Sequence, residues 1–248
     1  MTKIKITSIV LSLLIFLCIT SFVPKDADVV GKVSFPLGNV LILSKGEQQM
    51  RQVSFNMFVT NGDKIETKKQ SRCELTFNDG SVVRIDEQSI YTVEKAVMTK
   101  KVRNVESALS IGKLWANVKK VVGNKDSWKL KSPAAVVAVR GTIYRMNAGA
   151  DSSSQVLVYD GNVAVSPNLS TLAPGLGAVP GKPVQVQGPT QVQGPHPVSM
   201  SEWFEIVKAQ QQIIIRPDGS YVKSDFNLVD DAKLEWVRWN QERDELLN

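Results

Sequence analysis

The sequence has little of what catalysis and disulfide bonding need. It contains one histidine and two cysteines among 248 residues, and aromatic residues make up 7%. The histidine, His196, has no neighbouring serine, cysteine or second metal ligand, so neither a catalytic triad nor a zinc site is indicated. If Cys18 is removed with an N-terminal signal, Cys73 remains alone and no intramolecular disulfide can form. These scarcities predict a protein that is not an enzyme, holds no metal or cofactor, and is stabilised by packing.

The N-terminal segment is apolar and follows basic residues. Lys3 and Lys5 precede an apolar run over residues 6–23, which is typical of a secretory signal. The run is also long enough to span a bilayer if it is not cleaved. We therefore expect an exported protein, periplasmic or in the cell envelope, in which residues 1–23 are a signal peptide or an N-terminal membrane anchor. Contact with a membrane is expected only if this segment is not cleaved.

Charge is distributed unevenly along the chain. Residues 24–165 carry a net charge of +7, whereas residues 201–248 carry −4. The basic residues are scattered singly or in pairs, and no aromatic residues alternate with them as a nucleic-acid-binding surface requires. We therefore expect no nucleic-acid partner. The opposite charges of the two regions favour packing of the C-terminal segment against the basic part.

From residue 31 the sequence consists of short alternating or apolar runs separated by turn residues, a pattern typical of β-strands. Gly62 with Asp63, and Asp79 with Gly80, lie in turns that favour positive φ angles. Residues 102–116 fit either a strand or a short helix. In the predicted hairpin over residues 72–85, Cys73 shares an apolar face, which indicates a core residue, and the opposite face is expected to be wet. The fold class is therefore mainly β, a solenoid-like or sandwich-like stack of short strands.

The segment that contains VRGTIY raises a question about its arginine. Residues 134–139 are all apolar, so this strand is expected to be covered on both sides, and Arg140, Gly141 and Thr142 follow directly. A buried unpaired guanidinium is very costly. We expect Arg140 to be a structural anchor that pairs with Asp160 or Glu74; the alternative is that it binds an anionic ligand. Asp160 and Gly161 form the predicted turn of a further hairpin.

The last third of the chain changes in composition. Residues 166–200 hold most of the 11 prolines and nearly repeat the sequence VQVQGP, as expected for a Pro/Gly/Gln-rich linker. Residues 201–248 then predict a helix–hairpin–helix segment. Its helices are expected at residues 201–211 and 230–247, and its hairpin turns around Pro217, Asp218 and Gly219.

Four stretches in register resemble the FecR domain: NGDKIETKKQSRCELTFNDGSVVRIDEQSIYTV, GKLWANV, SPAAVVAVRGTIYRM and VLVYDGNVAV. The resemblance covers residues 29–165 and implies an all-β domain that works outside the cytoplasmic membrane. In the signalling members of that family, this domain relays contact with an outer-membrane transporter to a cytoplasmic segment that controls a sigma factor. Only a few residues precede the apolar run here, so we expect no sigma-binding segment.

Three functions remain open from the sequence. The first is a non-catalytic protein-interaction or structural module of the bacterial cell envelope that binds another envelope protein. The second is a carbohydrate-binding cell-wall protein, for which Trp115 and Trp128 are candidate sugar-stacking residues, although core packing is the expected role of both. The third is a membrane-tethered signalling regulator without its own sigma-binding segment.

Overall fold

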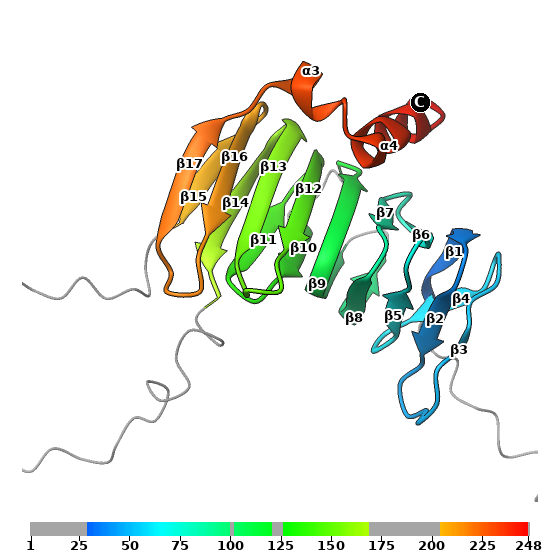
Figure 1. Ribbon diagram of the computed structural model, residues 1–248. Helices are drawn as coiled ribbons and strands as arrows, with labels where there is room; N and C mark the ends of the chain where they lie inside the picture. The colour runs from blue at the N-terminus through cyan, green and yellow to red at the C-terminus, as the bar shows by residue number, and fades with distance from the viewer. Residues whose placement is uncertain (1–28, 100–101, 121–125, 169–203, 248) are drawn as a thin grey trace, which may run out of the picture.

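The computed structural model describes residues 29–99, 102–120, 126–168 and 204–247, which form two stacked β-sheets (Figure 1). We name them sheet A and sheet B. Sheet A contains, in spatial order, β4 (Phe58–Thr60), β1 (Val29–Leu37), β6 (Arg72–Phe77), β7 (Val82–Ile85), the second half of β9 (Arg103–Val118), β12 (Thr142–Ala148), β13 (Ser154–Asp160), β16 (Gln211–Ile215) and β17 (Tyr221–Asp225). The expected mainly β fold is confirmed.

Sheet B follows the same course behind sheet A. It contains β3 (Arg51–Gln52), β2 (Val40–Leu43), β5 (Lys64–Thr67), β8 (Ser89–Met98), the first half of β9, β10 (Asp126–Lys131), β11 (Ala135–Val139), β14 (Asn162–Pro167) and β15 (Glu205–Lys208). Only the pairing of β9 with β10 is parallel among the described strands, so the sheet system is mixed.

Strand β9 joins the two sheets, which resolves the segment that fitted either a strand or a short helix. It pairs with β8 and β10 in sheet B up to residue 111, and with β7 and β12 in sheet A from residue 112. Gly112 has a φ of 101° where the strand bends. A Cβ atom there would lie 2.0 Å from the Ser89 Oγ atom, so only glycine fits this close crossing.

The core lies between the sheets and is filled by the inward side of every strand. Cys73, Leu75 and Phe77 face it from β6, as their alternation predicts. The Phe77 ring packs edge to face against the ring of Trp128, which comes from sheet B, and the two ring centroids are 5.0 Å apart. Burial raises the pKa of the Cys73 thiol to about 12, so Cys73 is an unreactive core residue, as expected.

Several turns carry the chain from one sheet to the other. The turn at Gly62 joins β4 in sheet A to β5 in sheet B, the turn at Gly141 joins β11 to β12, and the turn at Gly161 joins β13 to β14. The predicted hairpin at Asp160 and Gly161 is therefore wrong, because β13 and β14 pair with different neighbours. These corners give the sandwich its solenoid-like connectivity. The hairpin at Asp79 and Gly80 stays within sheet A and is confirmed.

Two expectations about exposure are wrong. The outer face of the β6–β7 hairpin is not wet, because helix α4 (Glu235–Glu245) covers it and Glu74 and Arg84 are buried. Strand β11 is not covered on both sides, because Val136 and Ala138 are half-exposed on the outer face of sheet B. Both errors have one cause, since alternation within a strand does not report which distant segment covers its outer face.

The C-terminal segment differs from the predicted helix–hairpin–helix. The expected helix at residues 201–211 is wrong where the structure describes it, because residues 205–208 form β15 and pair with β14. The hairpin is confirmed as β16 and β17. The second predicted helix, at residues 230–247, is confirmed over α4. Residues 232–234 separate α4 from a short helix, α3 (Leu228–Asp231), which the Asn227 side chain caps.

Some expectations lie outside the described residues. These are the N-terminal segment 1–23 with Cys18, most of the linker from residue 169 to 200, and His196.

Candidate functional site

The residues singled out from the sequence lie at corners and turns. Gly62, Gly80, Gly141 and Gly161 all adopt positive φ. The Asp63 carboxylate accepts hydrogen bonds from the backbone N–H and the hydroxyl of Thr60, at 2.8 Å and 3.1 Å. The corners at Gly141 and Gly161 are in contact, and the Thr142 hydroxyl donates to the Asn162 carbonyl oxygen at 2.9 Å. The structure therefore brings Gly141, Thr142 and Gly161 together, whereas Gly62 and Asp63 lie at a separate corner.

Arg140 is not a buried anchor. Its side chain is 56% exposed, and its Nε atom lies 3.7 Å from Asp126 Oδ2, a carboxylate other than the expected Asp160 or Glu74. Arg140 lines a shallow cavity of about 240 Å³ on the outer face of sheet B, together with Ala138, Ala164 and Ile206. The strand before Arg140 ends at the corner, and the guanidinium therefore reaches solvent without crossing the core.

The buried arginines lie elsewhere. Arg84, Arg103 and Arg145 are each at most 5% exposed. Arg103 joins the β6–β7 turn to β10, because it pairs with Asp79 at 2.7 Å and with Asp126 at 2.6 Å. The predicted turn residue Asp79 thus also binds an arginine, and its carboxylate accepts hydrogen bonds from Ser81.

The other two buried arginines belong to a polar row across the outer face of sheet A. Glu74, Arg84, Trp115 and Arg145 are cross-strand neighbours on β6, β7, β9 and β12. Arg84 is fully buried, and its Nε atom lies 2.6 Å from Glu74 Oε2. A charged row of this kind is stable out of water only when partners surround it.

Helix α4 supplies those partners. Asp244 accepts from Arg84 Nη1 at 2.7 Å and from Trp115 Nε1 at 2.9 Å. Arg243 donates to both carboxylate oxygens of Glu74, at 2.9 Å and 3.1 Å. The expected docking of the acidic C-terminal segment on the basic part is confirmed for α4. Among the apolar residues of this segment, Val237 is buried, whereas Leu234 and Leu246 are exposed.

The contacts of Glu74 with its neighbours determine whether its carboxyl group is ionised. Burial alone would raise the pKa of this carboxyl, but hydrogen bonds from Arg243, Arg84 and Ser34 outweigh burial and lower the pKa to about 2. Glu74 is therefore a carboxylate at neutral pH. Asp244 pairs with the same guanidinium, through Arg84 Nη1.

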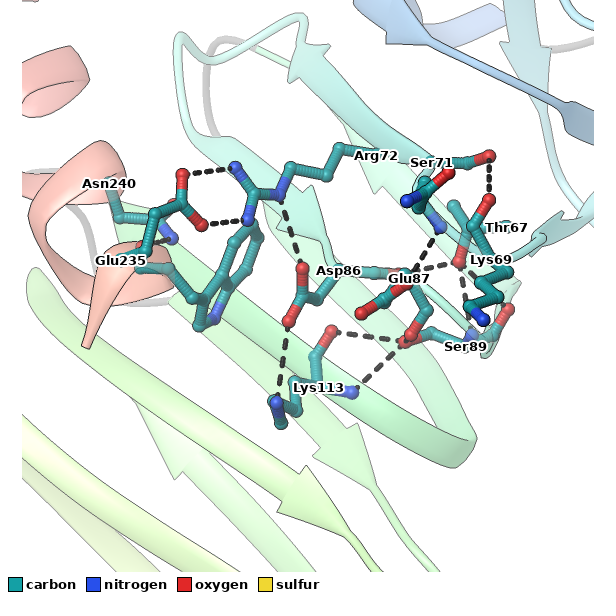
Figure 2. A network of polar contacts seen from close by, with 12 residues as sticks. Thr67, Lys69, Ser71, Arg72, Asp86, Glu87, Ser89, Lys113, Glu235 and Asn240 are labelled. Atoms are coloured by element: carbon teal, nitrogen blue, oxygen red, sulfur yellow. Dashed lines mark hydrogen bonds and ion pairs between the residues drawn. The ribbon is translucent and has the colours of Figure 1, made fainter.

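A second group of contacts lies at the start of α4 (Figure 2). Arg72 forms a two-pronged pair with Glu235, and its Nε atom lies 3.2 Å from Asp86 Oδ1. The Lys113 ammonium lies 3.5 Å from the other oxygen of Asp86, so Asp86 lies between two cations. The guanidinium of Arg72 also lies 5.0 Å from the ring centroids of Trp236 and of Trp239, which stack on each other.

Sequence reasoning missed this network almost entirely. Arg84 lies in the apolar run VVRI and directly opposite Glu74 in the predicted hairpin, which is the one local signal of a buried pair. Nothing local pointed to Asp244 or Arg145. Trp115 and Trp128 are core residues with 1% exposure, as expected, and neither ring is available to stack on a sugar.

The described residues contain neither a metal-binding cluster nor a membrane-spanning helix. Within the ranges that the structure covers, no group of three or more histidine, cysteine, aspartate or glutamate side chains is arranged to hold a metal ion. Likewise, no helix in the described part of the chain has the length and apolar character needed to cross a membrane.

Comparisons with known proteins show which proteins this chain is similar to. A search of curated proteins found no match. Two crystal structures of a proposed anti-sigma factor from Parabacteroides distasonis ATCC 8503 are similar. The one at 1.65 Å resolution has a TM-score of 0.45 and 19% identity, and the alignment covers 66% of this chain and 60% of that chain. The one at 2.50 Å has a TM-score of 0.47 and 17% identity, with 69% and 64% covered.

The chain thus spans less than two thirds of the length of those solved proteins. The model of the FecR protein family matches residues 63–164, from the corner at Asp63 into strand β14. The match includes the polar row of sheet A and the corners at Gly141 and Gly161, and it agrees with the resemblance of the sequence motifs. Residues 63–164 of this chain thus match the FecR protein family, over less than half of the chain.

Proposed function

We propose that this chain is a non-catalytic protein-binding module of the bacterial cell envelope, and that it binds its partner through the end of the sandwich formed by β15, β16 and β17. These strands follow the residues matched by the FecR family model and extend both sheets beyond it. The FecR match supports a regulatory module of the envelope. The apolar N-terminal run supports export.

The observation that carries the proposal is the exposure of β17. All five residues of this strand are exposed, and among the described strands it pairs only with β16. Val222 lies opposite Ile214 on the outer face of sheet A, and both are exposed. A strand at the edge of a sheet that carries exposed apolar side chains can receive a strand from another protein.

The structure also gives this edge a defined shape. The Tyr221 hydroxyl and the Lys223 ammonium both contact the Glu205 carboxylate of β15, at 2.7 Å and 3.3 Å. Lys223 additionally donates to the Ile206 carbonyl oxygen at 2.6 Å. These contacts hold the ends of sheets A and B together, so a partner would meet a preformed surface, which lowers the ordering cost of binding.

Photo-crosslinking in the native bacterium tests this proposal. A photoreactive phenylalanine analogue replaces Val222, and a matched variant carries it at Val97, which is similarly exposed on β8. We expect a discrete crosslinked protein from position 222 and none from position 97. A further variant carries the analogue at Ile214, which lies opposite Val222, and should give the same crosslink. Adding Val222→Glu to this variant should abolish the crosslink, whereas adding Val97→Glu should not.

Two results would overturn the proposal. One is equal crosslinking at both positions. The other is no crosslink at either position for a chain whose purified form binds cell-wall glycans, which would favour the carbohydrate-binding function. Mass spectrometry of the mature N-terminus then separates a released module from a tethered regulator, because retention of residues 1–23 would indicate an anchor.

A further inference from the structure

The outer face of sheet B has a row of aligned side chains across four strands, β10, β11, β14 and β15. Lys129 lies opposite Ala138, Ala138 lies opposite Ala164, and Ala164 lies opposite Ile206. The residues on either side of each of these four along the chain are mostly buried, so alternation directs the row outward. The centre of the row therefore presents only two methyl groups.

The two alanines lie on the floor of a shallow hollow. They line the cavity of about 240 Å³ on this face, together with Asn162, Arg140 and Ile206. This volume is several times larger than the ~30 Å³ that one water molecule occupies. The hollow can therefore receive apolar side chains of another segment.

Cations flank the hollow on both sides. Lys129 is exposed on β10 and Lys208 is exposed on β15. Within the part of the chain that the structure describes, neither ammonium group has an ion-pair partner. Arg140 adds a third cation beside the hollow, where its side chain is 56% exposed and lies 3.7 Å from Asp126. A partner in the hollow would therefore meet positive charge on each flank.

Nearby carboxylates do not neutralise this face. Among the residues of these four strands, only Asp126 and Glu205 are acidic. The Asp126 side chain is 2% exposed, and Glu205 lies 3.3 Å from Lys223 of sheet A. On the adjacent strand β9, Glu106 lies 3.7 Å from Lys131. The face is thus complementary in charge to an acidic partner.

Sheet A shows how this fold holds an acidic helix, because Asp244 of α4 pairs with Arg84 at 2.7 Å on its outer face. The dimensions of the face on sheet B suit a helix as well. A helix is about 10 Å across, whereas β10 and β15 are three strand spacings apart, or about 14 Å. A helix over β11 and β14 would therefore have Lys129 on one flank and Lys208 on the other.

We propose that this face docks an acidic amphipathic helix of a partner protein. The apolar side chains of the helix lie over the hollow and Ile206, and carboxylates on its flanks pair with Lys129, Arg140 and Lys208. A two-fold contact with a second copy fits less well, because it would bring like charges together. A lipid surface also fits less well, because the centre of the hollow offers no large apolar side chain to insert.

This surface lies on the face of sheet B and not at the edge of β17, so the inference does not depend on the proposed function. The test is an NMR titration of the full chain, labelled with carbon-13 in its alanine methyl groups. The probe is a stapled helical peptide of about 16 residues, or ~24 Å, with leucine at every third or fourth position and glutamate on both flanks.

The methyl signals of Ala138 and Ala164, assigned with serine variants, should shift saturably with this peptide at low salt. A second peptide with lysine in place of every glutamate should bind at least about tenfold more weakly. Added salt should weaken binding of the acidic peptide, because the ion pairs form at the surface.

Charge reversal locates the binding. Lys129→Glu combined with Lys208→Glu should weaken the acidic peptide at least about tenfold and strengthen binding of the lysine peptide. Lys32→Glu combined with Lys69→Glu is the matched control, because it makes the same change in net charge at exposed positions on β1 and before β6. It should alter binding by less than about twofold. Urea midpoints identify any variant that is simply unfolded.

Filling the hollow tests the apolar contact. Ala164→Phe places a ring where the helix would lie, so it should weaken the acidic peptide at least about fivefold. Thr92→Phe, at a half-exposed position on β8 of sheet B, is the control and should leave the affinity unchanged.

The inference fails if the two alanine signals do not shift, if both peptides bind equally, or if both charge-reversed proteins lose binding to the same extent. A dimer in sedimentation that the Lys129→Glu and Lys208→Glu protein loses would assign the face to a second copy. Binding to phosphatidylglycerol vesicles without binding of the acidic peptide, lost in the same protein, would assign it to lipid.

Peptide binding that occurs only after residues 169–203 are replaced by a short glycine–serine linker would assign the face to this chain itself, and would also overturn the inference. None of these results changes the crosslinks expected at position 222. The two proposals can therefore fail separately.

Discussion

The outer faces of the two sheets differ in what covers them. On sheet A, α4 lies over the row that contains Glu74 and Arg84, and the guanidinium of Arg84 is fully buried between carboxylates. On sheet B, the outer face beside Arg140 carries no helix among the described residues, and the Arg140 side chain is largely exposed. The burial of an arginine in this fold is therefore decided by a segment distant in sequence, and not by the apolar character of its own strand.

The largest expected effect comes from exchanging the two arginines for methionine. Arg84→Met removes a partner of both Glu74 and Asp244 in a buried site, so we expect the free energy of unfolding to fall by about 3–5 kcal/mol. Arg140→Met, the matched control on the open face, should cost at most about 1 kcal/mol. Urea denaturation of both purified variants measures the difference. Equal losses would contradict the comparison and restore Arg140 as an anchor.

The second prediction concerns acid. The pKa of Glu74 is lowered to about 2 in the folded protein, so its contribution to stability is fully present above the ordinary glutamate pKa and is lost as the pH falls towards 2. The expected loss over this range is about 3 kcal/mol, from a shift of roughly two and a half pKa units. Glu74→Gln should flatten the corresponding part of the stability curve.

Urea midpoints measured from pH 6 down to roughly pH 2.5 give this slope for both proteins. The lower limit is set by the expected loss of carboxylate pairing, which ends folding in acid. Asp160→Asn, at an exposed corner, is the control and should keep the slope of the unaltered chain. An identical slope for Glu74→Gln and the unaltered chain would mean that other carboxyls cause the acid sensitivity.

Much of the fold could be predicted from local pattern, and its limits are physical. Alternation in β6 placed Cys73, Leu75 and Phe77 in the core, and turn residues marked the corners correctly. Whether a turn returns in the same sheet or crosses to the other depends on tertiary packing, so the corner at Gly161 was misinterpreted as a hairpin. The segment WFEIV at residues 203–207 fitted a helix, but pairing with β14 makes it a strand from residue 205.

The candidate site was harder to predict than the fold. Opposite charges of the two regions correctly favoured docking of α4, yet they did not indicate which carboxylates would pair. Arg84 and Asp244 are 160 residues apart, and their contact depends on the register of α4 over sheet A. Motif content instead drew attention to Arg140, whose corner position leads its side chain to solvent.

The smallest expected effect lies where the covered face of sheet A reaches solvent. Glu235 is mostly exposed, although its hydrogen bond with Arg72 lowers its pKa. Glu235→Gln should therefore reduce the free energy of unfolding by at most about 1 kcal/mol, and added salt should shrink the difference because exposed pairs are screened. Urea midpoints at low and high salt measure it. A loss as large as that of Arg84→Met, insensitive to salt, would show that the buried network extends to the first turn of α4 and that the border between covered and open surface lies beyond Arg72.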